Sequence, residues 1–142
     1  MKKLIYIGIL ILFIIVLFVI FCNVMYIKNT KIDQDGVTIK AIDNTITPTS
    51  VTVLIKSEKV EYTYAWEYRY RLQKRVFCTW EEVPILEDEY IIIAISMALD
   101  ENNEHEYTLR WQNKYGSLKK GTYRAVLYCD GKEFFSEPFK IN

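Results

Sequence analysis

His105 is the one imidazole among the 142 residues, so a Ser-His-Asp or Cys-His catalytic group would have to use it. It lies in the charged segment from Asp100 to Glu106, which is typical of a solvated loop between strands. No Gly-x-Ser-x-Gly nucleophile motif occurs in the chain. We therefore expect a surface histidine and no catalytic residues.

Asp100, Asn102 and Glu104 alternate like the first ligands of a calcium-binding loop. Such a loop also needs Gly at its sixth position and Glu at its twelfth, where this chain has His105 and Trp111. A single His and 3 Cys exclude a zinc cluster of Cys and His ligands. The sequence thus predicts no metal ion and no cofactor.

A basic stripe lies beside Tyr68 and Tyr70. It could be a face that binds an anion, a polymer or a partner. It is more typical of the solvent side of a strand whose aromatic residues point inward and whose arginines pair with acids on the neighbouring strand. If a partner face exists, the stripe is our first choice for it. Its residues are Arg69, Arg71, Lys74 and Arg75.

The whole chain is electrically neutral, with 18 Lys and Arg against 18 Asp and Glu. Nucleic-acid-binding domains carry a strong excess of basic residues, so no nucleic-acid partner is expected. Hydrophobic residues are 51% and charged residues 25%, as in a folded domain.

Lys2 and Lys3 are followed by an uncharged apolar run from Leu4 to Cys22. As a helix this run is roughly 28 Å long, close to the thickness of a bilayer core. A cleaved signal peptide has a shorter apolar region and a small-x-small cleavage site, and a lipoprotein signal has a small residue where Phe21 precedes Cys22. We favour an uncleaved signal anchor over these two alternatives.

This interpretation divides the chain into an anchor at 1–25, a linker at 26–36 and a domain at 37–142. A short basic tail before the apolar run favours a cytoplasmic N-terminus and an extracytoplasmic C-terminal domain. The protein is therefore expected to be a single-pass protein of the cell membrane, contacting the lipid bilayer through residues 4–24.

Beyond Gly36 the apolar residues alternate with a period of two, which predicts strands rather than helices. Asp130-Gly131 between two such runs is a strong hairpin signal. The pattern is that of an antiparallel β-sandwich. The expected strands are 37–42, 50–56, 66–73, a hairpin over 75–83, 90–99, 105–111, 123–129 and 133–141.

Five motifs of the chain form a familiar set: Glu61-Tyr62-Thr63-Tyr64, Tyr68 to Lys74, Trp80 to Pro84, Trp111 to Leu118, and Leu118-Lys119-Lys120-Gly121-Thr122-Tyr123. Together they resemble the bacterial immunoglobulin-like domain of Gram-positive surface proteins, over roughly Val37 to Ile141. Two departures stand out: Ala65 replaces a Gly that is frequent after Tyr-Thr-Tyr, and 76–79 replaces a frequent Asp-Gly turn, so this hairpin is expected to differ.

The last motif resembles the Leu-x-x-Gly-x-Tyr corner of immunoglobulin-like sandwiches, formed here by Leu118, Gly121 and Tyr123. The resemblance implies that the Tyr123 hydroxyl turns back to the loop before its strand. The usual inter-sheet disulfide has a Cys two residues after this Tyr, but Cys129 lies six residues after it. A Cys78–Cys129 disulfide and buried thiols both remain open, as does a lipid on Cys22.

The resemblance implies an extracytoplasmic domain without known catalytic residues. Our hypothesis is a non-catalytic, membrane-anchored immunoglobulin-like module with a structural or protein-binding role at the bacterial surface. The expected partner is a membrane-adjacent protein or a cell-wall component. The alternative is a membrane-tethered inhibitor or regulator of a protease or wall enzyme, which would bind through the loops at one end of the sandwich.

Overall fold

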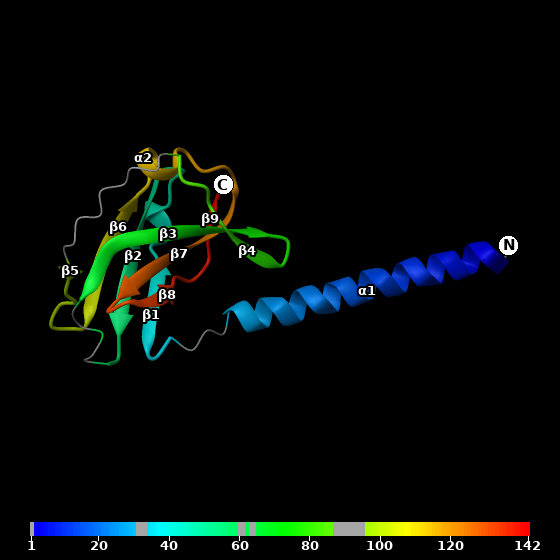
Figure 1. Ribbon diagram of the computed structural model, residues 1–142, viewed down its shortest axis with the longest axis horizontal. Coiled ribbons are helices and arrows are strands. Elements are labelled where there is room, and N and C mark those ends of the chain that lie inside the picture. The colour runs from blue at the N-terminus through cyan, green and yellow to red at the C-terminus, as the bar shows by residue number, and fades with distance from the viewer. Residues whose placement is uncertain (1, 31–33, 60–61, 63–64, 87–95) are drawn as a thin grey trace. The chain divides into compact units, whose positions relative to one another are not determined.

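Figure 1 shows the computed structural model of the protein, which describes residues 2–30, 34–59, 62, 65–86 and 96–142. The chain divides into two compact units. The first comprises Met1–Ile32 and Val76–Thr79, and the second comprises Asp33–Arg75 and Trp80–Asn142.

The N-terminal segment is one helix, α1, from Lys2 to Thr30. Its stretch Tyr6–Val24 has 19 residues, a mean hydropathy of 3.2 and exposed side chains. The helix is long and apolar enough to cross a membrane, a property that signal sequences near an N-terminus share. It also runs five residues into the range 26–36, which is predicted from the sequence to be a linker.

The second unit is built of antiparallel strands, because most of its segments alternate buried and exposed side chains. In β2, for example, Val51, Val53 and Ile55 are fully buried. The strands are β1 Val37–Ala41, β2 Ser50–Ser57, β3 Trp66–Val76, β4 Thr79–Glu82, β5 Ser96–Met97, β6 Glu104–Arg110, β7 Gly121–Cys129, β8 Lys132–Phe135 and β9 Phe139–Ile141.

Two sheets result. One has the order β1-β2-β6, and the other has the order β4-β3-β7-β8, with β5 also paired to β3 and β9 also paired to β7. In Figure 1, β3 and β7 pass in front of β2 and β6. Inward side chains of both sheets form one hydrophobic cluster, which includes Val53 and Leu109 from the first sheet and Trp66, Leu72 and Leu127 from the second.

The β7–β8 hairpin turns at Asp130 and Gly131, as the sequence predicts. Their φ angles of 48° and 74° are left-handed, a conformation that Gly adopts without strain and Asp tolerates better than most residues. The expected strand over 133–141 is split into β8 and β9, both paired with β7. The split contains Pro138, which has no N–H to donate to a ladder.

Tyr123 forms the corner that the resemblance implied. It is buried, and its hydroxyl donates a hydrogen bond to the Lys119 carbonyl at 2.7 Å. Leu118 is buried beside it in the same core. Gly121 leaves space for this packing, because a Cβ there would lie 3.1 Å from Cε of Lys74 and 3.3 Å from the Tyr123 ring.

Two short helical elements were not predicted: a 3-10 turn, η1, at Asp43–Thr45, and a single turn, α2, at Gln112–Tyr115. Each is too short to produce a helical period in the sequence. Of the strand expected at 90–99, residues 90–95 lie outside the described residues, and Ser96–Met97 forms β5.

The hairpin expected over 75–83 is present as β3 and β4, but Cys78 lies in its turn and not on a strand face with Val76 and Trp80. The residue before it, Phe77, has a φ angle of 53°. Ala65, at the other departure from the family pattern, also has a left-handed φ angle, of 68°.

Of the alternatives for the cysteines, a Cys78–Cys129 disulfide is not formed: Cys78 is bonded to Cys22, with Cα atoms 5.1 Å apart. Cys129 pairs with Trp66 at one end of β3, whereas Cys78 follows the other end. At about 3.4 Å per residue, eleven residues of strand keep these two cysteines on the order of 30 Å apart. The sulfur of Cys22 is used in the disulfide, so it cannot also carry a lipid.

Candidate functional site

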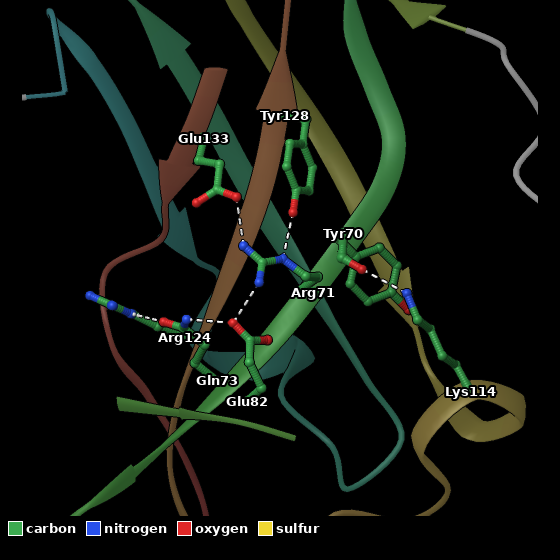
Figure 2. Close-up of polar contacts among 8 residues, drawn as sticks. All are labelled: Tyr70, Arg71, Gln73, Glu82, Lys114, Arg124, Tyr128 and Glu133. Atoms are coloured by element: carbon green, nitrogen blue, oxygen red, sulfur yellow. Dashed lines mark hydrogen bonds and ion pairs between the residues drawn. The ribbon is translucent and has the colours of Figure 1, made fainter. Parts of the chain in front are cut away.

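Arg71 on β3 is the hub of a polar network on the face of the large sheet that points away from the core (Figure 2). Its guanidinium donates to the Tyr128 hydroxyl at 2.5 Å, to Glu82 at 2.7 Å and to Glu133 at 2.6 Å. These partners come from β7, β4 and β8, so one side chain bridges four strands. Three donors of one planar guanidinium therefore have three different acceptors, which fixes the orientation of the arginine.

Arg124 on β7 is the second arginine of this face and is 8% exposed. Its guanidinium carbon lies 4.5 Å from the ring centre of Trp80 and 4.4 Å from that of Phe135. Its Nε donates to Gln73 Oε1 at 2.7 Å, and the amide of Gln73 donates in turn to Glu82 at 2.7 Å (Figure 2). Two aromatic rings and one amide therefore hold Arg124 in a single orientation.

Arg69 completes the row on β3. Its guanidinium carbon lies 4.2 Å above the Tyr128 ring, and its Nε pairs with the Glu67 carboxylate. We call the connected surface the arginine face. It consists of Glu67, Arg69, Arg71, Gln73, Trp80, Glu82, Arg124, Tyr128, Glu133 and Phe135.

Burial and pairing act differently on the two central arginines. Burial opposes the charge of Arg71, but the Tyr128 hydroxyl and the carboxylates of Glu82 and Glu133 outweigh it and raise the pKa. Burial lowers the pKa of Arg124 to about 10, with a small opposing effect of Glu82. Both side chains are cations at neutral pH.

The arginine face carries three arginines and three glutamates, so its charges balance. A polyanion would have to displace the glutamates from the arginines that they contact. Arginine, tyrosine and tryptophan are, in contrast, the residues that dominate protein–protein interfaces. The face is therefore better suited to a protein surface than to an anionic polymer.

The structure brings together two of the four residues of the predicted basic stripe, Arg69 and Arg71, and both are paired with acids. Lys74 is not part of this network: its Nζ lies 5.8 Å from the ring centre of the core residue Tyr123. Arg75 is half-buried at the end of β3. Of the two tyrosines, Tyr70 is buried, as expected. Tyr68 is 40% exposed, and its ring lies edge-on to that of Tyr107, which packs against the core, with the ring centres 5.4 Å apart.

Lys114 of α2 is a further buried cation, which contacts the middle of β3 (Figure 2). Its Nζ donates to the Tyr70 carbonyl at 2.8 Å and lies 5.2 Å from the ring centres of Tyr70 and Tyr115. Burial, with a smaller effect of Arg71, lowers its pKa. This lysine ties α2 to the sheet and so has a structural role.

Sequence reasoning missed most of the arginine face, because its residues come from four strands. Trp80, Arg124, Tyr128 and Phe135 have no common spacing in the chain. A usable signal was Arg124 itself, a cation inside the otherwise apolar strand from Tyr123 to Leu127.

The residues considered for catalysis or metal binding have other roles. Asp100 Oδ1 accepts the backbone N–H groups of Asn102 and Glu104, both at 2.9 Å, and these bonds lower its pKa. His105 lies on β6 opposite Ile55 of β2. Within the described ranges, no group of three His, Cys, Asp or Glu side chains could hold a metal ion.

The family model of the bacterial Ig-like domain matches residues 33–136. The match covers more than half of the chain, which therefore belongs to this family. Members of such a family are typically surface or interaction modules without catalysis. Neither a curated protein nor a solved structure matches the chain.

Proposed function

We propose that this protein is a single-pass membrane protein that holds an immunoglobulin-like β-sandwich outside the cytoplasm of a Gram-positive bacterium. In this proposal the domain is a non-catalytic module that binds a membrane-adjacent protein through the arginine face. The observation that carries the proposal is the ordered arrangement of Arg71, Tyr128 and Trp80 on an outward surface, with Arg124 buried against Trp80 and with three glutamates balancing the three arginines of the face.

Three properties support the membrane location. The stretch Tyr6–Val24 is apolar, uncharged and of bilayer length. Lys2 and Lys3 precede it, which favours a cytoplasmic N-terminus. The Cys22–Cys78 disulfide is typical of an oxidising, extracytoplasmic environment.

The arginine face supports the binding role because its side chains are already held in place. A free interface loses side-chain entropy when it binds, at a cost of about 0.5–1.5 kcal/mol for each mobile side chain. Arg71 and Arg124 each have fixed partners, so less of this entropy remains to be lost. Membrane tethering raises the effective concentration of both partners, so the contact itself can be weak.

The location is tested by fractionation and protease treatment of cells that produce the full chain. We expect the protein to stay with membranes after alkaline extraction, and protease added to spheroplasts to remove the domain. A mature N-terminus beyond Cys22, or a domain protected from protease, would refute the proposed topology.

The binding role is tested with a photo-crosslinking amino acid at Tyr128 and, as matched control, at Thr108, an exposed residue on β6 of the other sheet. We expect a defined protein adduct from position 128 and a much weaker one from position 108. Arg71→Glu, which reverses the central charge, should abolish the adduct. Equal adducts from both positions, or an adduct with wall polymer alone, would contradict the proposed partner.

A further inference from the structure

The turn between β3 and β4 is covalently joined to the apolar helix. The disulfide between Cys22 and Cys78 holds their Cα atoms 5.1 Å apart, and the turn Val76–Thr79 belongs to the same compact unit as α1. The hydroxyl of Thr79 donates to the Val76 carbonyl at 3.1 Å and closes the turn. The turn is thus a defined loop whose distance from the helix is set by a covalent bond.

The position of Cys22 in the helix sets the depth of this turn. Cys22 lies two residues before Val24, the end of the apolar stretch. At 1.5 Å per residue this is about 3 Å along the helix axis. If Tyr6–Val24 spans a bilayer, Cys78 and its neighbours lie at the boundary between hydrocarbon and headgroups.

Phe77, the neighbour of Cys78 in this turn, is the side chain that would lie at the bilayer surface. It is 85% exposed, more than any other large hydrophobic side chain that the structure describes, those of the helix included. Its φ angle of 53° is one that bulky side chains adopt at a cost. The β7–β8 turn of the same domain also has left-handed φ angles, but its residues there are Asp130 and Gly131. Both residue types tolerate this conformation, and neither exposes a large apolar side chain to water.

Trp and Tyr are enriched at membrane–water interfaces, and Phe is among the residues that interfacial segments bury at the boundary between headgroups and acyl chains. An exposed phenylalanine at a hairpin tip, linked to a membrane helix at that level, fits a lipid surface better than it fits water. We propose that the β3–β4 turn is a second membrane contact, in which the Cys22–Cys78 disulfide holds the turn at the bilayer surface and Phe77 inserts among the lipid headgroups.

This inference rests on the proposed membrane anchoring and adds a consequence to it. A helix and a linker alone leave a domain free to turn, whereas two attachments restrict its rotation. A restricted domain loses less rotational freedom on binding a neighbour in the same membrane. The turn would therefore help the arginine face to act on a membrane-adjacent protein.

The test uses the full chain with Phe77→Trp in phosphatidylcholine vesicles. Some of the lipids are brominated near the headgroups, and bromine quenches the fluorescence of an indole that lies close to it. Emission is compared with that of the parent chain to remove the contribution of its native tryptophans. Asp130→Trp is the matched control, because it places an indole on the other left-handed hairpin turn, which lacks a link to the helix. Peptide mapping without reduction identifies the disulfide.

We expect a linked peptide pair containing Cys22 and Cys78, a loss of emission from Phe77→Trp, and a smaller loss from Asp130→Trp. Adding Cys22→Ser to Phe77→Trp should weaken the quenching. Absence of the linked pair, absence of quenching, or equal quenching of both indoles would overturn the inference. Release of the parent chain from vesicles by alkaline washing would instead refute the anchoring, so the two failures are distinct.

In case Phe77→Trp or Cys22→Ser disturbs folding, the second measurement uses Phe77→Asn, a polar residue that tolerates the left-handed conformation. A lipid-soluble photoreactive probe is used to label the parent chain and this variant in vesicles. We expect label on the peptide of residues 76–79 in the parent chain and its loss in Phe77→Asn. Equal labelling of that peptide in the two chains would overturn the inference.

Discussion

The two faces of β3 and β7 are made by the same strands but are stabilised by different interactions. The inner face carries Leu72 and Leu127, both fully buried in an apolar core. The outer face carries Arg71 and Arg124, which contact carboxylates, an amide and aromatic rings. Fully buried apolar groups contribute to stability mainly by leaving water, whereas exposed ion pairs add little, since water solvates the separated charges well. The inner face should therefore determine stability, and the outer face should be available for binding.

Leu127→Ala should have the largest effect. Leu127 is fully buried, and removing its side chain loses transfer free energy and leaves a cavity. We expect the free energy of unfolding to fall by about 2–5 kcal/mol in chemical denaturation of the full chain in detergent. Lys140→Ala, an exposed residue of β9, is the control. A loss as small as that of the control would show that the inner face does not determine stability.

Alkaline pH should reveal the next largest effect through Tyr115, which is buried against the same core. Burial raises its pKa to about 12 from an ordinary value of 10.0. The unfolded phenol ionises near pH 10, so the stability that Tyr115 contributes is complete below pH 10 and is lost as the pH rises towards 12. Two pKa units correspond to about 2–3 kcal/mol at the alkaline limit.

The measurement for Tyr115 is a series of unfolding curves between pH 8 and pH 12. Tyr115→Phe removes the ionisable group, so its unfolding free energy should fall less steeply above pH 10 than that of the parent chain. Parallel pH profiles of the two chains would show that the phenol does not contribute to alkaline unfolding.

Tyr123→Phe tests one hydroxyl at the end of the inner face. It removes the 2.7 Å hydrogen bond to Lys119 and leaves the carbonyl of that residue without this donor. We expect a loss of about 1–2 kcal/mol in unfolding free energy, with an unchanged β-type circular dichroism spectrum. If the free energy of unfolding changes by less than about 0.5 kcal/mol, the hydrogen bond of this hydroxyl does not stabilise the corner.

Arg124→Met should have the smallest effect, although Arg124 lies on β7 only three residues from Leu127 and is also buried. Methionine retains the apolar contacts with Trp80 and Phe135 and removes a charge that is costly to bury. The free energy of unfolding should therefore change by less than about 1 kcal/mol in either direction. A loss equal to that of Leu127→Ala would remove the distinction between the two faces.

Much of the strand pattern was determined by the sequence, because alternation of apolar and polar residues is a local property. The strands over 37–41 and 50–57 and the hairpin turn at Asp130-Gly131 follow from it directly. The apolar run at the N-terminus likewise determined a helix, since it is long, uncharged and free of proline. Where the local signal was interrupted, as at Pro138 and Cys78, the predicted boundaries were wrong.

Only the tertiary structure decided which side chains meet. Arg71 contacts Tyr128 and Glu133, which are 57 and 62 residues away in the chain, because β7 and β8 pair in a particular order and register. Cys78 reaches Cys22 and not Cys129 because the length of β3 separates Cys78 from Cys129. Residue spacing along a strand gives the face on which a side chain lies, but its neighbours depend on the pairing of strands that are distant in sequence.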